Sequence, residues 1–174
     1  MNLTINAPVH LRPIIITAFH TGMRKGEILN LKWQNIDRKA GFIRLPAEMV
    51  KEKKAKSIPI NHHVQEVFDK IPRSLKSDYV FLWRGKRIKS DIRRSLLKAS
   101  QEAGLTYGQN VLNGWRLHDI RGTVKTFMLR AGVDPAIRSI LLGHSLKGMD
   151  IFDWWFVNLN YIGCHKTVQL PDNF

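Results

Sequence analysis

The stretch Thr21-Gly22-Met23-Arg24-Lys25-Gly26-Glu27-Ile28-Leu29 marks the junction of two predicted helices. Apolar residues recur at helical spacing over residues 11–19, and Gly22 is a suitable stop for that helix. A second short helix is predicted at residues 27–31. Arg24 therefore lies in a turn, from which its side chain can project. A lone arginine in such a turn is more often an ordinary solvated residue, so its role depends on the rest of the chain.

Two later segments carry side chains of the same kinds. His118 and Arg121 are three positions apart on a helix predicted at about residues 118–130, so they share one face. Leu142-Gly143-His144 ends a helix that opens on Asp134-Pro135, a capping residue followed by proline at the first helical position. Each segment alone is weak evidence, because similar pairs and terminal histidines are common on helices. Their joint occurrence in this order is much less expected by chance.

The remaining pattern predicts a fold that is mainly α with a small antiparallel β-sheet. Two strands and two further helices are expected, at residues 41–45, 56–60, about 61–71 and about 90–103. Asn61 and Ser90 can cap the first turns of these two helices. No internal repeat or interdomain linker is apparent, so residues 1–174 are expected to form a single domain.

The composition is that of a globular domain. A hydrophobic fraction of 44% in 174 residues is enough for a substantial apolar core. No apolar run reaches the length of about 18 residues that a membrane span needs, and residues 1–8 lack the pattern of a secretory signal. Cys164 stands alone, which excludes an internal disulfide and a cysteine metal cluster. A cytoplasmic protein is the default expectation.

The charge balance is strongly basic, since 28 Lys and Arg residues against 14 Asp and Glu residues give a formal net charge of +14. Such an excess favours a polyanionic partner, because each lysine or arginine that binds a phosphate releases condensed counterions. The basic residues are dispersed rather than gathered on one amphipathic helix, so no membrane partner is expected. The alternative on charge alone is a basic RNA-binding or ribosome-associated protein.

Two arginines and two histidines on separate segments suit one chemical task, the binding and polarisation of a phosphodiester. Transesterification at phosphorus builds negative charge on the non-bridging oxygens, and a planar guanidinium can bond two of them at once. Arg24 and Arg121 can therefore stabilise that charge without a metal ion. Histidine can take up the proton of a nucleophile or bond a phosphate oxygen. The sequence shows no obvious carboxylate cluster for a two-metal site, so no metal or nucleotide cofactor is expected.

These segments resemble the catalytic domain of the tyrosine recombinases, the phage integrase family, over about residues 11–150. The resemblance is most specific in the opening stretch, in Leu31-Lys32-Trp33 and in Ile140-Leu141-Leu142-Gly143-His144-Ser145. It implies double-stranded DNA as the partner, with self-association of the protein on DNA. The reaction it implies is site-specific recombination or integration, by metal-free cleavage and rejoining of phosphodiesters through a 3′-phosphotyrosyl intermediate.

The resemblance also implies roles for individual residues. Arg24 is matched to the first catalytic arginine of the family, and Glu27 to a structural partner that orients its loop. His118 and Arg121 are matched to the histidine and arginine of the catalytic pair. His144 is matched to an additional position that holds histidine or tryptophan in the family.

The hairpin lysine of the family is best matched by Lys51, although Lys53 and Lys54 are neighbours that can be mistaken for it. An ordinary solvated lysine in a basic turn is the alternative for Lys51. Contacts with the DNA backbone are expected from Lys53, Lys54 and a basic stretch further along, for which an ordinary charged helix face is the alternative. That stretch comprises Arg84, Lys86, Arg87, Lys89, Arg93 and Arg94.

The sequence departs from the family where the nucleophilic tyrosine is expected. Asp153 occupies roughly that place, and an aspartate cannot form a phosphotyrosine bond. Tyr161, the only tyrosine further along, lies beyond the usual spacing. Three interpretations of this tail are open. Tyr161 reaches the phosphate if the segment loops out, or the nucleophile has been lost. Alternatively, Trp154-Trp155-Phe156 docks on another protomer, which is compatible with loss of the nucleophile. Residues 151–174 are thus an atypical C-terminal tail.

The sequence begins almost at the catalytic domain. Integrases of this family usually carry an N-terminal core-binding domain that clamps the opposite face of DNA, and that domain is expected to be absent. A fragment of a longer recombinase and a truncated element both fit this interpretation. Two functions follow: an active recombinase, or a DNA-binding remnant that has kept its arginines and histidines without a working nucleophile.

Overall fold

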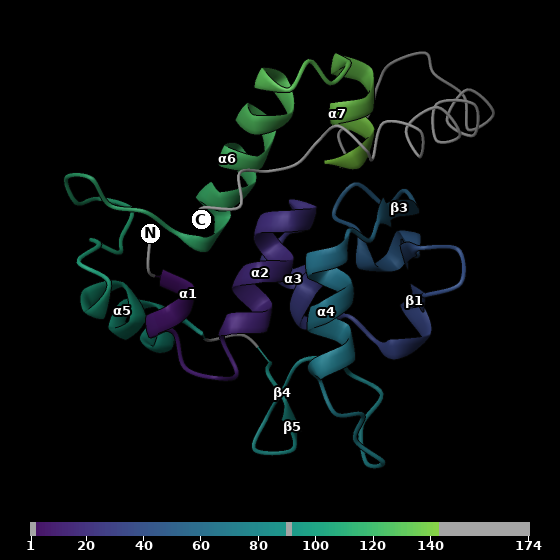
Figure 1. Cartoon of the computed structure of the whole chain (residues 1–174), viewed down its shortest axis with the longest axis horizontal. Coiled ribbons are helices and arrows are strands. Elements are labelled where there is room, and N and C mark those ends of the chain that lie inside the picture. Colours follow the sequence, from purple (N-terminus) through teal and green to yellow (C-terminus); the bar gives the residue numbers. More distant parts are fainter. Residues whose placement is uncertain (1–2, 90–91, 143–174) are drawn as a thin grey trace.

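The computed structural model describes residues 3–89 and 92–142 (Figure 1). The described residues form seven α-helices: α1 (Leu3–Asn6), α2 (Arg12–Thr21), α3 (Lys25–Leu29), α4 (His62–Lys70), α5 (Arg93–Glu102), α6 (Leu117–Arg130) and α7 (Pro135–Leu141). They also form five short strands: β1 (Ile36–Asp37), β2 (Phe42–Leu45), β3 (Lys56–Pro59), β4 (Leu82–Trp83) and β5 (Lys86–Arg87). Two 3₁₀-helices, η1 (Trp33–Asn35) and η2 (Ala47–Met49), flank β1 and β2. No helix in this part of the chain is long and apolar enough to cross a membrane.

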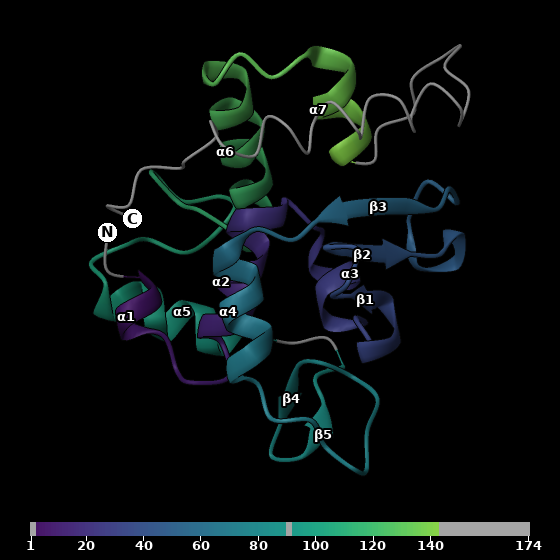
Figure 2. The ribbon, with the colours of Figure 1, turned by 45° about the vertical axis from the view of Figure 1, so that its right-hand side comes forward.

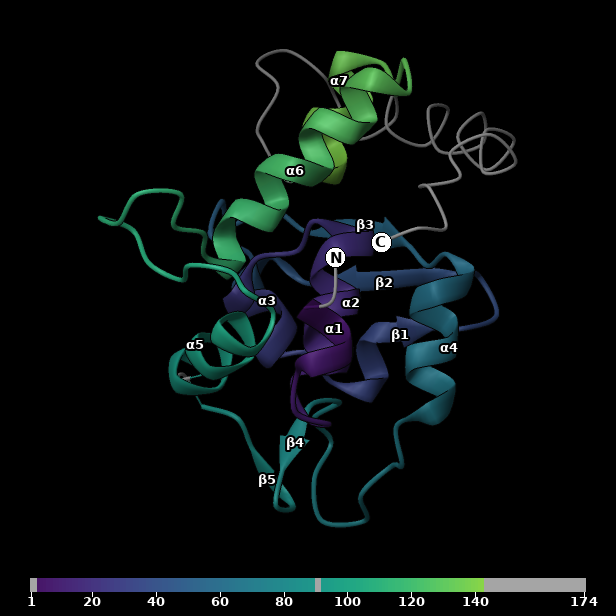
Figure 3. The same ribbon diagram turned by 60° about the vertical axis from the view of Figure 1, so that its left-hand side comes forward.

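The predicted fold class, mainly α with a small antiparallel sheet, is confirmed. Helix α2 forms the centre, where it packs against α3, α4 and α6. The three-stranded sheet lies to one side of this helical centre (Figure 2), and α1 packs against α5 away from the sheet (Figure 3). Leu11, Ile14 and Phe68 are among the fully buried side chains, so apolar burial supplies the main driving force for this packing.

The sheet directs alternate side chains of β2 and β3 into the core. The strands run antiparallel in the order β1-β2-β3, with Ile43 opposite Ile58 and Leu45 opposite Lys56. Since side chains alternate between the faces of a strand, these four residues point to the same face, and all four are buried. The two strands predicted from the sequence are therefore confirmed, while the two-residue strand β1 is an addition that the sequence did not predict.

Most of the predicted helices are confirmed, with small shifts of their ends. Helix α3 begins earlier than predicted. Asn61 caps α4 as expected, because its side-chain oxygen accepts the N–H of Val64 at 3.1 Å. Asp134 caps α7, since its carboxylate accepts the N–H of Ala136 at 2.7 Å. Helix α5 begins at Arg93, and Ser90, the residue predicted to cap it, lies outside the described residues.

The hairpin formed by β4 and β5 corrects the interpretation of the first part of the basic stretch. Arg84 and Gly85 have φ angles of 51° and 72° and form the loop between the two strands. Two consecutive residues in the left-handed region match the turn that suits the twist of a hairpin. An arginine is unusual at the first of these positions, which is why the sequence carried little signal for a turn here.

Gly22 ends α2 where the chain turns toward α3. Its φ angle of 63° lies in the left-handed region, and its N–H donates to the carbonyl oxygen of Ala18. A β-carbon at this position would lie 2.7 Å from Cδ2 of Leu142 and 3.4 Å from Cγ1 of Val124. The missing side chain therefore allows α6 and the end of α7 to approach the turn.

We predict that Gly22→Ala lowers the free energy of unfolding by about 1–3 kcal/mol, because the alanine would be strained in the left-handed region and would contact Leu142 too closely. Urea denaturation followed by circular dichroism measures this change. Gly26→Ala is the matched control, since a β-carbon there meets no atom within 4 Å. Gly26 lies within α3, so this substitution should be neutral or stabilising by up to about 1 kcal/mol. Equal effects of the two substitutions would contradict the prediction.

His20, near the end of α2, is a half-buried imidazole beside two other histidines. Its ring centroid lies 4.3 Å from that of His63, and its Nδ1 lies 3.1 Å from Nδ2 of Asn61. Burial, followed by the nearby charges of His63 and His62, lowers the pKa of His20 from 6.5 to about 4. Between pH 6.5 and about 4, this histidine therefore binds a proton in the unfolded chain but not in the folded chain.

We predict that this histidine makes the folded chain less stable as the pH falls from 6.5 to about 4. Its contribution to the loss should be about 1–2 kcal/mol, less than the full shift implies because the ring is partly solvated. Urea denaturation at several pH values should give a flatter stability profile for His20→Gln than for the wild type. An unchanged slope in His20→Gln would rule out this contribution.

Candidate active site

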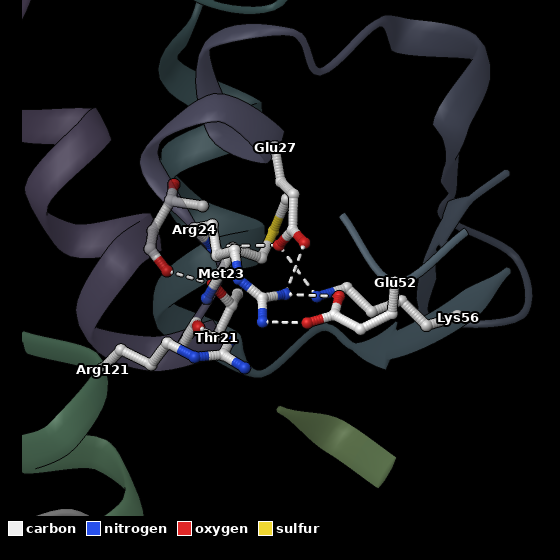
Figure 4. Close-up of polar contacts among 9 residues, drawn as sticks. Thr21, Met23, Arg24, Glu27, Glu52, Lys56 and Arg121 are labelled. Carbon is white, nitrogen blue, oxygen red and sulfur yellow. Dashed lines mark hydrogen bonds and ion pairs between the residues drawn. The ribbon is translucent and has the colours of Figure 1, made fainter. Parts of the chain in front are cut away.

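Glu27 fixes the conformation of Arg24 at the start of α3. Arg24 precedes the helix with extended backbone, and its N–H donates to Oε2 of Glu27 at 2.9 Å. The other carboxylate oxygen of Glu27 accepts from Nη1 of Arg24 at 3.3 Å (Figure 4). A glutamate in the first turn also interacts favourably with the helix dipole. The backbone and the side chain of Arg24 are therefore both bonded to one carboxylate.

Lys56 is a buried lysine beside Glu27 and Arg24, and the sequence analysis missed it. These residues form a charged cluster. Its side chain is only 5% exposed, and its Nζ lies 2.8 Å from Oε2 of Glu27. Burial lowers the pKa of Lys56, Glu27 opposes that effect, and the charges of Arg121 and Arg24 lower the pKa further, so the net shift is downward. Alternation along β3 was a usable signal, because it places Lys56 on the same face as the apolar Ile58.

Arg121, on α6, reaches the turn between α2 and α3. Its guanidinium is buried, and Nη1 donates to the carbonyl oxygen of Gly22 at 2.7 Å. The other terminal nitrogen, Nη2, is buried without a hydrogen-bond partner among the described residues. Burial, followed by the charge of Arg24, lowers the pKa of Arg121. The structure thus brings together the two arginines that the sequence singled out, although they lie 97 positions apart in the sequence.

Glu52 is a second acidic residue that the sequence analysis missed. Its two carboxylate oxygens accept from the two terminal nitrogens of Arg24, with 2.8 Å between Nη1 and Oε2 and a still shorter contact between Nη2 and Oε1 (Figure 4). Burial alone would raise the pKa of Glu52, but a hydrogen bond with its own backbone and the charge of Arg24 outweigh that effect and lower it. The planar fork of Arg24 is therefore occupied by a carboxylate.

The lysines of the turn between β2 and β3 are not among the residues that bond Arg24 in the described part of the chain. Lys51, Lys53 and Lys54 are all exposed, and Lys53 adopts a left-handed φ angle of 55°. The structure does not bring Lys51, the predicted hairpin lysine, into contact with Arg24. Lys51 is nevertheless the immediate neighbour of Glu52, which does contact that arginine.

His118 is exposed in the first turn of α6, on the same helix as Arg121. The start of this helix is fixed by Asp119, whose carboxylate accepts the backbone N–H of Arg116 at 2.8 Å. The other predicted residues of the site, His144 and the candidate nucleophile Tyr161, lie outside the described residues, as does Asp153.

The basic stretch is split between a hairpin and the start of α5. Its exposed members are Arg84, Lys86, Lys89, Arg93 and Arg94. Arg87 is only half-buried, but its guanidinium bonds Oδ1 of Asn30 and lies 4.4 Å from the ring centroid of Tyr79. Arg87 is therefore committed to contacts within the fold, and the exposed Arg84 also lies 5.5 Å from the ring centroid of Trp83.

The cluster as a whole combines three cations with two carboxylates around one turn. Arg24, Lys56 and Arg121 supply the positive charges, and Glu27 and Glu52 the negative ones. This cluster is chemically able to bind an oxyanion. Arg121 has a buried donor without a partner among the described residues, and Arg24 already bonds the two carboxylate oxygens of Glu52.

The chain belongs to the phage integrase family, whose pattern matches residues 1–149. This confirms the family that the sequence resembles. The integrase of Salmonella phage P22 is 26% identical over 134 residues, which cover 73% of this chain and 34% of that protein. Tyrosine recombinase XerA of Pyrococcus furiosus is 29% identical over 140 residues, covering 77% of this chain and 46% of that protein. The chain thus spans less than half the length of these relatives.

Solved structures show the same fold. A crystal structure of XerA recombinase superposes with a TM-score of 0.65 at 20% sequence identity, covering 91% of this chain and 60% of that one. A lambda integrase tetramer bound to a Holliday junction gives a TM-score of 0.66 at 20% identity, covering 85% of this chain and 46% of that one. The described helices and sheet are therefore those of a tyrosine recombinase catalytic domain.

We predict that Lys56→Met lowers the free energy of unfolding by about 2–4 kcal/mol, because it leaves the buried carboxylate of Glu27 without its ammonium partner. Urea denaturation measures the loss. Lys54→Met removes the same charge from an exposed position and should change stability by less than about 0.5 kcal/mol. The double variant Lys56→Met/Glu27→Gln should recover part of the loss. A single variant as stable as the control would mean that this ion pair contributes nothing.

Proposed function

We propose that this chain is the catalytic part of a tyrosine recombinase that performs site-specific recombination of double-stranded DNA. The observation that carries the proposal is the convergence of Arg24 and Arg121 on one turn, where Arg24 bonds two carboxylate oxygens and Arg121 has a buried donor without a partner among the described residues. Membership of the phage integrase family supports a reaction at phosphodiesters as the use of that site.

In the proposed reaction, a tyrosine oxygen attacks the phosphorus and the bond from phosphorus to the 5′ oxygen breaks. Negative charge develops on the non-bridging oxygens, where Arg24 and Arg121 stabilise it. His118 takes up or shares the proton of the attacking hydroxyl, and His144 bonds a phosphate oxygen. Lys51 gives a proton to the departing 5′ oxygen. Rejoining reverses these steps, so the bond energy is kept in the 3′-phosphotyrosyl intermediate and no metal or nucleotide cofactor is required.

The proposed partners are double-stranded DNA and further copies of the protein. The net charge of +14 and the exposed basic residues favour a polyanionic partner. The lambda integrase of similar fold is a tetramer bound to a Holliday junction, which supports assembly of several protomers on DNA. Among the exposed residues, Lys53, Lys54, Arg84 and Arg94 are proposed to contact the DNA backbone.

The second candidate function is a DNA-binding remnant without a working nucleophile. It is favoured by Asp153, which stands roughly where the family has its tyrosine. In this case the cluster around Arg24 would still bind phosphate, but no covalent intermediate would form. Tyr161 is the nucleophile of the first candidate, so the two functions differ in a measurable product.

Covalent trapping on nicked duplexes with a randomised core distinguishes the two. Without added metal, we expect an adduct that survives denaturation, with the attachment mapped to Tyr161 by mass spectrometry. Tyr161→Phe should abolish the adduct, and Arg24→Ala should reduce it by about 100-fold or more. An adduct that persists in both variants would contradict the assigned roles. DNA binding without an adduct, also in a longer chain extended at its N-terminus, would favour the remnant.

A further inference from the structure

The proposed reaction needs the guanidinium of Arg24 to bind the phosphate, but this group is already bonded to the carboxylate of Glu52. Both terminal nitrogens of the guanidinium donate to both oxygens of the Glu52 carboxylate (Figure 4). This is the geometry in which an arginine would bind two oxygens of a phosphate. A phosphodiester therefore cannot make the same paired contact with Arg24 until Glu52 has left.

We propose that Glu52 is a positioning residue that stands in for the phosphodiester at Arg24, and that DNA binding must displace it. This inference rests on the proposed function, since it assumes that Arg24 receives a phosphate. It adds a residue and a step: binding of the phosphate is an exchange of one anion for another.

The charges of the cluster support an exchange rather than a simple addition. Three cations and two carboxylates meet around the turn, and a phosphodiester carries the same single negative charge as the Glu52 carboxylate. Exchange of the two leaves the local charge unchanged. Removal of the carboxylate without replacement would leave partly buried cations without a counter-charge, which is costly.

Of the two carboxylates, Glu52 is the one that can leave. The side chain of Glu27 is 2% exposed and bonds the backbone of Arg24 as well as Lys56, so its departure would disrupt the start of α3. The side chain of Glu52 is 23% exposed, and it contacts the Arg24 guanidinium and its own backbone. Its release breaks one ion pair and one local hydrogen bond, but no helix cap.

Glu52 lies beside Lys51, the proposed proton donor. These two residues are adjacent in a short loop between the buried Val50 and the buried Lys56. In the present arrangement Glu52 faces Arg24 while Lys51 is exposed. Rotation of the Glu52 side chain is enough to free the guanidinium, so the exchange does not require the buried ends of the loop to move.

The test compares Glu52→Gln with Glu48→Gln, an equal change of net charge at an exposed glutamate nearby. Binding of a fluorescent duplex is measured by anisotropy at fixed salt. We expect Glu52→Gln to bind about threefold to tenfold more tightly than the wild type, because DNA no longer competes with a carboxylate. Glu48→Gln should change affinity by less than about twofold. Glu52→Ser should match Glu52→Gln, and urea denaturation checks that each variant is folded.

The same substitutions are repeated in an Arg24→Ala background, where the carboxylate has no guanidinium to occupy. There Glu52→Gln should have no more effect than Glu48→Gln. Equal effects of the two glutamate variants with Arg24 present, weaker binding by Glu52→Gln, or an effect that persists without Arg24 would each overturn the inference. If Arg24→Ala and Arg121→Ala both bind DNA like the wild type, the phosphate site itself fails, which is a separate outcome that concerns the proposed function.

Discussion

The buried carboxylate of Glu27 is the interaction on which the site depends. It bonds the backbone N–H and the guanidinium of Arg24, and it pairs with the ammonium of Lys56 from the sheet. One side chain thus joins the start of α3 to β3, two elements that the chain order separates. A charge taken out of water needs such partners, so the same contacts that satisfy the carboxylate also fix the direction of the arginine.

The sequence predicted those parts of the fold whose signals are local. The capping residues Asn61 and Asp134 bond the first turns of their helices as expected, and Gly22 ends α2 in the left-handed region. The hairpin at Arg84 and Gly85 was missed, because its turn lacks the residues that usually adopt two left-handed conformations in succession. Local chemistry was informative only where the residue type matched the backbone that it adopts.

The candidate site was predicted in its arginines but not in the residues around them. Arg24 and Arg121 were recognised from the motifs that contain them, whereas Lys56 and Glu52 belong to no motif and acquire their contacts only in three dimensions. Lys56 opens a predicted strand, so alternation with Ile58 indicated its burial but not its pairing with Glu27. Pairing between distant segments is a tertiary property, which composition and spacing do not encode directly.

The register of β2 and β3 has a consequence for how such a chain can diverge. A slip of one residue along β3 would turn Lys56 outward, bring Ser57 to the core face and leave Glu27 without its cation. Insertions and deletions in the loop between the strands leave this register untouched. The loop is therefore free to vary in length after Glu52, while the ladder of backbone hydrogen bonds preserves the electrostatic centre. Sequence drift in this region should thus be tolerated best between Glu52 and Lys56, and should spare Lys51, Glu52 and the strand that follows.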